Sequence, residues 1–171
     1  ALNSAVDGAT LIVHAFEGLY TLNDKNVPVP GQAKSVEISE DGKTYTFTLK
    51  DNLKWSDGTP LVASDFVYSW NRAADPKTGA DYGYMFDVIK GYAECHDAIA
   101  EATKDLDPEA DDYDDLYAEA TKDINMNLAV TAKDDKTLVV ELVTAVPYFL
   151  ELTAFPAYSP VKKSVIEEKG E

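Results

Sequence analysis

Several residue types that build common functional sites are scarce in this sequence. It contains one cysteine, Cys95, and two histidines, His14 and His96. A single cysteine excludes an internal disulfide, and these three side chains are too few for a structural zinc site. Cys95 and His96 are neighbours on a predicted helix, where consecutive side chains diverge by about 100°, so they do not act as a pair. We therefore expect neither a metal centre nor a cofactor.

Positive charge is also scarce. Fifteen Lys and Arg residues stand against 31 Asp and Glu residues, and the formal net charge is −16. Binding to a phosphate backbone needs clustered Lys and Arg, so this composition excludes a nucleic-acid-binding domain. An anionic membrane surface would repel the same charge. No apolar run approaches the roughly 20 residues of a membrane-spanning helix.

The sequence also lacks the usual catalytic motifs. It contains neither the Gly-x-Ser-x-Gly of a nucleophile elbow nor the Gly-x-x-x-x-Gly-Lys of a phosphate-binding loop. Carboxylates are abundant, so a hydrolase that uses a carboxylate pair stays open as an alternative, but no spacing singles out a pair. We expect a protein without catalytic residues.

The clearest positive pattern is a β-hairpin at residues 36–49. Apolar and polar residues alternate along both strands, as is typical of strands with one buried face. The pair Asp41-Gly42 between them fits the positive φ angles of a tight turn. The alternation predicts that Tyr45, Phe47 and Leu49 point into the core.

A second hairpin is predicted at residues 128–142, with its turn at 133–136. Two hairpins suffice for a four-stranded antiparallel sheet with one buried face. Residues 63–73 have the apolar spacing of an amphipathic helix, although Val62 before it cannot cap the helix with a side-chain oxygen. The fold class is therefore α+β, an antiparallel sheet built from two β-hairpins with flanking helices. We expect one domain over residues 1–171.

The two ends of this unit are predicted as follows. Near the N-terminus, Asp7 is placed to cap a short helix that ends at Gly18 in a left-handed conformation, with His14 on its polar flank. A short strand at residues 19–22 and an irregular proline-rich crossing at residues 27–31 come next. A helix at residues 162–169 ends the chain.

The segment between the hairpins is predicted to form two helices, at residues 93–106 and 112–124. The acidic run between them invites a calcium-binding interpretation. However, an EF-hand loop starting at Asp105 would place Ala110 where glycine is needed and Leu116 where glutamate is needed. A solvated linker fits better. An acidic extracellular interaction or calcium-binding domain that uses Asp111 and Asp112 remains an alternative.

Several stretches resemble a known family. The residues that carry the resemblance are Glu-Asp-Gly at 40–42, Lys-Trp-Ser-Asp-Gly-Thr-Pro at 54–60, Asp-Phe-Val-Tyr-Ser-Trp at 65–70, Asp-Pro-Lys-Thr at 75–78 and Val-Pro-Tyr-Phe-Leu at 146–150. These stretches resemble in sequence the extracellular solute-binding proteins of peptide ABC importers, the oligopeptide- and dipeptide-binding family (bacterial family 5). The resemblance fades near residues 86–124, so residues 93–124 are interpreted as a variable helical insertion.

The resemblance implies a place in a larger fold. Family members have two lobes of the periplasmic-binding-protein type, and this chain resembles a segment of the N-terminal lobe. The sequence opens on Ala-Leu-Asn-Ser without the pattern of a secretory leader, and we expect it to be a fragment of a longer binding protein. Tyr82 aligns with a tyrosine that reaches the peptide cleft, and Val6 and Asp7 lie in the segment that runs past the ligand. The resemblance places the acidic group for a peptide N-terminus elsewhere.

The expected function is that of the substrate-binding component of an ABC importer. The resemblance implies a protein that captures oligopeptides and delivers them to a membrane permease. It also implies a monomer that works in the periplasm or, with a lipid anchor, on the extracellular face of the membrane. Nickel, haem or an oligosaccharide would be the ligand in other branches of the family and stay open as alternatives.

Overall fold

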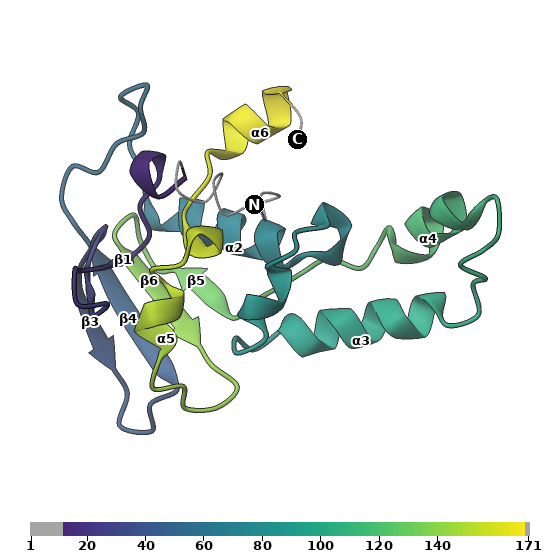
Figure 1. Cartoon of the computed structure of the whole chain (residues 1–171), viewed down its shortest axis with the longest axis horizontal. Helices are drawn as coiled ribbons and strands as arrows, with labels where there is room; N and C mark the ends of the chain where they lie inside the picture. The colour runs from purple at the N-terminus through teal and green to yellow at the C-terminus, as the bar shows by residue number, and fades with distance from the viewer. Residues whose placement is uncertain (1–11, 170–171) are drawn as a thin grey trace.

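In the computed structural model, residues 12–169 are described (Figure 1). Short antiparallel strands on one side of the molecule pack against helices, and a helical arm projects away from them. The elements in chain order are β1 (Tyr20–Leu22), β2 (Pro28–Pro30), β3 (Ala33–Ile38), β4 (Thr44–Leu49), α2 (Ala63–Ala74), η1 (Pro76–Thr78), η2 (Gly83–Phe86), α3 (Tyr92–Thr103), α4 (Tyr113–Thr121), β5 (Val130–Ala132), β6 (Thr137–Glu141), α5 (Phe149–Leu152), η3 (Pro156–Tyr158) and α6 (Lys163–Lys169). The α+β class expected from the sequence is confirmed.

The main sheet has four antiparallel strands in the order β3-β4-β6-β5. Each predicted hairpin supplies two strands, and the two hairpins join through β4 and β6, where Tyr45 faces Val140 and Phe47 faces Leu138. Tyr45, Phe47 and Leu49 are buried, while the threonines between them are half-exposed. The predicted register is therefore confirmed, because burying one face of a strand leaves its alternate residues on the other face.

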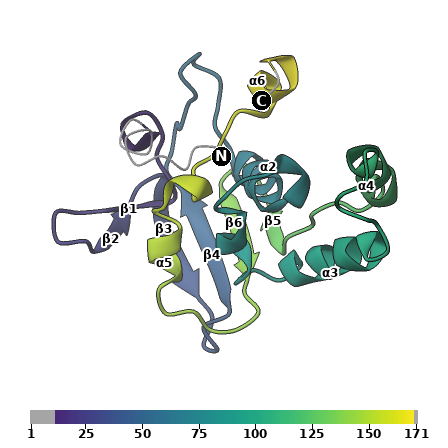
Figure 2. The ribbon, with the colours of Figure 1, turned by 45° about the vertical axis from the view of Figure 1, so that its right-hand side comes forward.

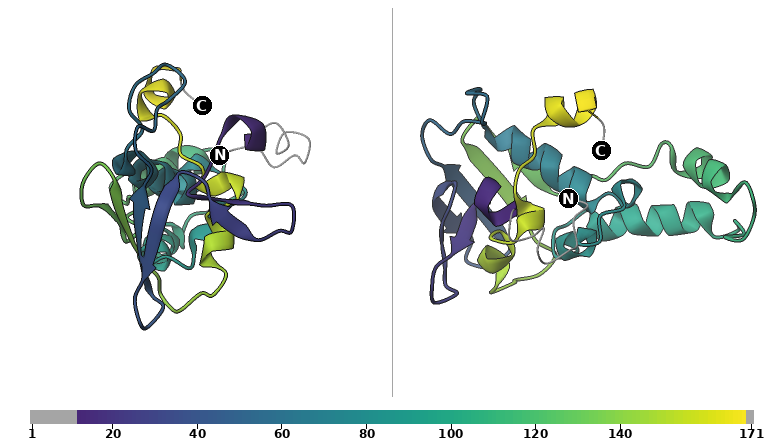
Figure 3. Two further views of the ribbon diagram at one scale, coloured as in Figure 1. Left: turned by 90° about the vertical axis from the view of Figure 1, so that its left-hand side faces the viewer. Right: turned by 45° about the horizontal axis from the view of Figure 1, so that its top comes forward.

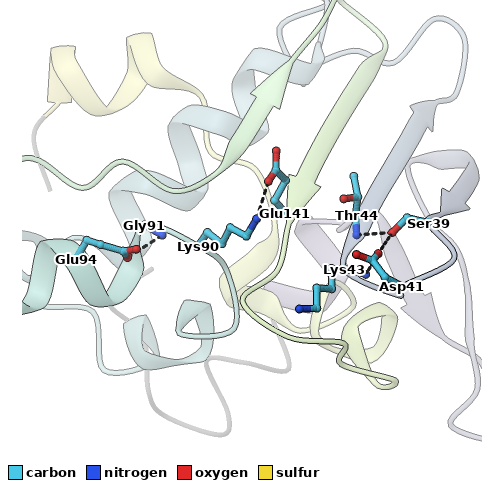
Figure 4. A network of polar contacts seen from close by, with 8 residues as sticks. All are labelled: Ser39, Asp41, Lys43, Thr44, Lys90, Gly91, Glu94 and Glu141. Atoms are coloured by element: carbon cyan, nitrogen blue, oxygen red, sulfur yellow. Dashed lines mark hydrogen bonds and ion pairs between the residues drawn. The ribbon is translucent and has the colours of Figure 1, made fainter.

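The turn between β3 and β4 differs from the predicted one. Only Gly42 has a positive φ, of 69°, and Asp41 instead uses its side chain. The Asp41 carboxylate accepts hydrogen bonds from the Ser39 hydroxyl at 2.5 Å and the Lys43 amide at 3.1 Å, and the Ser39 hydroxyl accepts one from the Thr44 amide at 2.9 Å (Figure 4). The hydrogen bond from Ser39 and then that from Lys43 hold the pKa of Asp41 below its ordinary value.

The proline-rich crossing is a strand, which corrects the sequence prediction. Pro28 and Pro30 face Leu22 and Tyr20 across the β1–β2 pair. The inter-strand hydrogen bonds at the two ends of this pair run from Asn23 N to the Val27 carbonyl and from Gly31 N to the Leu19 carbonyl, each at 3.0 Å. The prolines therefore occupy the alternate positions, where a backbone N–H would point away from the partner strand.

Helix α2 begins at Ala63, as predicted, although Val62 offers no capping oxygen. Two other groups complete its first turn. The Asp65 carboxylate accepts a hydrogen bond from the Val62 amide at 2.9 Å, and the Asp135 carbonyl, in the turn of the second hairpin, accepts one from the Ala63 amide at 2.8 Å. A carboxylate in the first turn also interacts favourably with the helix dipole. The helix is thus tied to the sheet at its start.

The core lies between one face of the sheet and the helices α2 and α5 (Figure 2). It is rich in aromatic rings, and Trp70, Phe86, Phe149 and Tyr158 are fully buried. The Tyr158 ring lies 4.2 Å from the Phe86 ring and 4.9 Å from the Trp70 ring. Its hydroxyl donates a hydrogen bond to the Met85 carbonyl at 2.7 Å, and burial raises the pKa of that hydroxyl well above its ordinary value.

Helices α3 and α4 form an arm (residues 92–123) that projects from the sheet (Figure 1). Both helices are shorter than predicted, and the apolar side chains of Ala102 and Leu116 on them are exposed. The arm holds twelve Asp and Glu residues and two lysines, so it carries a net charge of −10 out of −16 for the whole chain. The mostly exposed polar surface leaves only a narrow packed seam between the helices.

The two legs of the arm meet at one base. Gly91 has a φ of 94°, and a Cβ there would lie 2.1 Å from the Asn127 carbonyl oxygen on the returning leg. The Ala129 amide donates to the Lys90 carbonyl at 2.7 Å. The Lys90 ammonium binds Glu141 of β6 at 2.9 Å (Figure 4). Glycine is required at position 91 because both the conformation and the space exclude a side chain.

Candidate functional site

A hollow of about 330 Å³ lies beside β1, where the N-terminal helical turn meets the segment after α5. Figure 3 shows this helical turn, in purple, near the short yellow helical turn that follows α5. The residues that line the hollow are Ile12, Val13, His14, Ala15, Phe16, Glu17, Gly18, Tyr20, Thr21, Gln32, Ala154, Pro156 and Ser159. Hydroxyl, amide, imidazole and carboxylate groups are all represented, so the hollow offers both donors and acceptors.

Two glycines, Gly18 in the lining of the hollow and Gly31 outside it, allow backbone segments to approach each other. A Cβ at Gly18 would lie 2.3 Å from the Thr153 carbonyl oxygen, and one at Gly31 would lie 2.7 Å from the Gly18 carbonyl oxygen. Gly18 is not among the residues with positive φ. The prediction that it ends a helix in a left-handed conformation is therefore wrong, and the close approach to Thr153 is the reason for glycine here.

The N-terminal helical turn gives the hollow an open wall. The described helical residues are 12–15, and the Phe16 amide donates to the Ile12 carbonyl at 2.8 Å. The side chains of Val13 and Phe16 are 57% and 44% exposed. Val13 and Phe16 therefore leave exposed apolar surface on the wall of a hollow whose other groups are mostly polar. His14, predicted on the polar flank of this helix, is exposed and lines the same wall.

One residue that lines the hollow has an unpaired polar atom. The Oε1 atom of Gln32 is buried and has no hydrogen-bond partner within residues 12–169. Gln32 follows Gly31 in the close crossing of backbones, and its own amide donates to the Gly18 carbonyl at 2.9 Å. Sequence reasoning did not identify this residue, because a single glutamine in a loop carries no motif. Only the pairing of residues 18–19 with residues 31–33 places it in the hollow.

Tyr82, predicted to face a ligand, lies next to the hollow and is not one of its lining residues. It precedes η2 and is half-buried. Its ring packs edge-on against Phe155 at 5.1 Å between ring centroids and lies 6.4 Å from the Tyr84 ring. Phe155 lies between Ala154 and Pro156, two residues of the hollow, so Tyr82 and the hollow share one segment. Val6 and Asp7, the other predicted ligand residues, lie outside the described residues.

Residues 158–163, which follow Ala154 and Pro156 of the hollow, are tied to α2 by side-chain hydrogen bonds. The Trp70 indole donates to the Tyr158 carbonyl at 2.8 Å. The Ser69 hydroxyl accepts from the Val161 amide at 2.8 Å and donates to the Asp65 carbonyl at 2.6 Å. We name residues 158–163 the strap. It fixes the C-terminal side of the hollow to the main helix.

The strap also reaches the loop at residues 54–60. The Lys162 ammonium, whose side chain is 22% exposed, binds the Asp57 carboxylate and donates to the Thr59 hydroxyl at 2.9 Å. The hydrogen bonds from Lys162 and then from Thr59 lower the pKa of Asp57. The Lys-Trp-Ser-Asp-Gly-Thr-Pro stretch thus contributes a polar contact that holds the strap.

Neither the acidic arm nor the Cys95 thiol forms a metal-binding or reactive site among the residues that the structure describes. Within residues 12–169, no three Asp, Glu, His or Cys side chains lie close enough together to hold a metal ion. Cys95 is buried, and burial raises the pKa of its thiol, which favours the unreactive protonated form. The His96 ring stacks on Tyr92 at 4.1 Å. None of the helices in the described part of the chain has the length and apolar composition to cross a membrane.

Comparison with known proteins gives a consistent set of relatives. The chain is 40% identical to the oligopeptide-binding protein OppA of Bacillus subtilis over 166 residues, which are 97% of this chain and 26% of that protein. It is 37% identical to the probable deoxycholate-binding periplasmic protein YgiS of Escherichia coli over 95% of this chain and 26% of that protein. The chain therefore spans about a quarter of the length of the curated relatives it matches.

Solved structures show the same likeness in three dimensions. The structure described as Listeria monocytogenes OppA bound to peptide superposes with a TM-score of 0.79 at 34% identity, covering 99% of this chain and 29% of that one. The sheet and helices described above are thus part of a periplasmic-binding-protein-like fold. The family model described as bacterial extracellular solute-binding proteins, family 5 Middle, matches residues 27–171. Because this match covers most of the chain, the chain belongs to the family 5 bacterial extracellular solute-binding proteins.

Proposed function

We propose that this chain is a lobe segment of the substrate-binding component of an ABC importer, which captures oligopeptides outside the membrane. The observation that carries the proposal is the likeness to OppA proteins over nearly the whole chain, including one structure described as bound to peptide. In this proposal the whole protein acts as a monomer and delivers peptides to a membrane permease. It works in the periplasm or is lipid-anchored on the extracellular face of the membrane.

The hollow supports a binding role rather than a chemical one. An extended peptide is held mainly through its main-chain N–H and C=O groups, and such contacts do not depend on peptide sequence. A hollow that offers both donors and acceptors, with Tyr82 and Phe155 beside it, suits this kind of ligand. Val6 and Asp7 are proposed as further residues that bind the peptide.

The domain organisation is part of the same proposal. Residues 1–171 act as one domain of the longer protein, and residues 93–124 form a helical insertion within it. The base of the arm supports this view, because Gly91 and Asn127 bring its two legs together at one point. The remaining ligand contacts, including the acidic group for the peptide N-terminus, come from parts of the protein outside this chain.

Native mass spectrometry of the gently purified longer protein tests the ligand class. A ladder of short-peptide masses is expected. A single mass of a bile acid would point instead to the class named in the YgiS relative. A sugar, nickel or haem mass would likewise overturn the peptide proposal while keeping the family.

Substitution of Tyr82 tests the position of the site. Tyr82→Ala in the longer protein is expected to weaken peptide binding about tenfold in calorimetry, because an aromatic contact of this kind contributes about 1 kcal/mol beyond its buried area. Tyr82→Phe separates the hydroxyl from the ring. Tyr148→Ala, which removes a 55% exposed tyrosine away from the hollow, is the matched control. Equal affinities for Tyr82→Ala and Tyr148→Ala would place the peptide elsewhere.

A further inference from the structure

Three aromatic rings lie next to one another beside the hollow. Phe155, between the lining residues Ala154 and Pro156, packs edge-on against Tyr82 with the ring centroids 5.1 Å apart. The Tyr84 ring follows, 6.4 Å from the Tyr82 ring and tilted by 42° to it. Phe155 and Tyr82 are half-buried, whereas Tyr84 is 61% exposed. We name Tyr82, Tyr84 and Phe155 the aromatic shelf.

The backbone that carries Tyr84 is held in place by contacts with the core. A Cβ at Gly83 would lie 2.9 Å from the Ala73 carbonyl oxygen, so η2 packs directly against α2. The Met85 carbonyl accepts the hydrogen bond from the buried Tyr158 hydroxyl at 2.7 Å. The exposed Tyr84 ring therefore extends from a fixed segment. A tyrosine side chain has few rotatable bonds, so a contact with this ring costs little conformational entropy.

The aromatic shelf differs from an ordinary exposed tyrosine. A single exposed apolar side chain is common on protein surfaces and needs no explanation. Here the exposed Tyr84 ring ends a row of contacting rings that adjoins, through Phe155, the hollow assigned above to the peptide main chain. An extended peptide places successive side chains on opposite sides. A main chain in the hollow can therefore direct one side chain onto the shelf while the neighbouring side chains point away.

The chemistry of the aromatic shelf decides which side chain it binds best. An aromatic side chain gains from the burial of its own area and from edge-to-face contact with the rings of the shelf. A lysine side chain would gain a cation–π contact and an attraction to the exposed carboxylates of Asp81 and Asp87, which are both weak at an exposed position. The same carboxylates disfavour an acidic side chain. Phenylalanine or tyrosine in the ligand therefore fits the shelf best.

We propose that the aromatic shelf is a specificity-determining subsite, which binds an aromatic side chain of the peptide whose main chain lies in the hollow. Tyr84 supplies the open ring surface, and Phe155 joins the shelf to the hollow. The inference rests on the proposed peptide-binding function and adds to it a preference at one position of the ligand. Recognition through the main chain alone would not distinguish between side chains.

The test uses the longer protein and a set of penta-alanine peptides that each carry phenylalanine at one position. At least one of them is expected to bind the wild type about tenfold more tightly than penta-alanine in calorimetry. In Tyr84→Ala this ratio of affinities is expected to fall below about threefold, because the open ring is gone. Tyr84→Phe keeps the ring and should keep the ratio. Tyr148→Ala removes a 55% exposed tyrosine outside the hollow and the shelf, and it is the matched control.

A second peptide set identifies the kind of side chain on the shelf. At the position where phenylalanine raises the affinity, it is replaced by lysine or by glutamate. Both replacements are expected to bind the wild type more weakly than the phenylalanine peptide does, and glutamate most weakly. If the lysine peptide binds more tightly than the phenylalanine peptide, the shelf is a cation subsite and the inference is wrong.

The outcomes separate this inference from the proposed function. If the wild type binds penta-alanine and no phenylalanine peptide binds more tightly, the inference fails while peptide binding stands. The inference also fails if the preference for phenylalanine is as large in Tyr84→Ala as in the wild type, because the side chain then lies elsewhere. If the wild type binds none of the peptides, both proposals are overturned.

Discussion

Replacing Ser69 by alanine should destabilise the fold by loosening the strap from α2. The Ser69 side chain is almost fully buried, and its hydroxyl accepts the Val161 amide proton at 2.8 Å. An unsatisfied buried donor costs about 1–3 kcal/mol. Val161 is only half-buried, so water restores part of the loss and the expected cost is about 1–2 kcal/mol. For a chain of this size that corresponds to a fall in melting temperature of about 2–8 °C.

Urea unfolding and hydrogen exchange measure this effect at two levels. Unfolding curves give the free energy difference, and the Val161 amide should exchange faster in Ser69→Ala than in the wild type because it has lost its acceptor. Ser35→Ala is the control, since Ser35 is exposed on β3 and its hydroxyl has no hydrogen bond to a described residue. The reasoning is refuted if the two variants are equally stable, or if Val161 keeps its protection in Ser69→Ala.

Three further changes test other contacts. Val62→Thr should stabilise the chain by about 0.5–1 kcal/mol in urea unfolding, because it adds the missing N-cap oxygen to α2; a loss of stability would show that the half-buried valine methyl matters more. Gly91→Ala should lower the free energy of unfolding by about 3 kcal/mol or more, because strain at φ 94° adds to a contact at 2.1 Å. Gly79→Ala, where φ is positive but the space is open, should lower it by only about 1 kcal/mol. Equal losses of stability in the two variants would remove the steric explanation. The folded-state pKa of Asp57 is lowered, so its contact with Lys162 stabilises the fold above the unfolded pKa of about 3.9 and is lost as pH falls through the folded value. The stability difference between wild type and Lys162→Met should therefore be constant from pH 8 to 5 and shrink in stronger acid; a difference at pH 2 as large as that at pH 7 would contradict this.

The sequence predicted the parts of the fold that depend on local pattern. The alternation of Tyr45, Phe47 and Leu49 fixed which face of β4 is buried, because a strand has only two faces. The spacing of Phe66 and Trp70 placed α2 within one residue of its observed end. Both patterns are strong because several apolar residues in the same segment follow the same spacing.

The predictions that failed depended on contacts between distant segments. Pro28 and Pro30 looked incompatible with a strand until the register against β1 placed them where no donor is needed. Gly18 looked like a helix stop, yet its reason is the carbonyl of Thr153, far away along the chain. Gln32 entered the candidate site for the same kind of reason. No sequence window contains these pairs of residues, so only the assembled fold could reveal them.

The closed base of the arm has a consequence for how the chain tolerates change. The backbone at Lys90–Gly91 contacts the backbone at Asn127–Ala129. The two ends of the arm are therefore held together at the sheet, whatever the length of the chain between them. Closing a loop between fixed ends costs only about 0.6 kcal/mol for each doubling of its length. We therefore expect the arm to tolerate insertions, deletions or replacement by a foreign helical hairpin without a change in the register of β5 and β6.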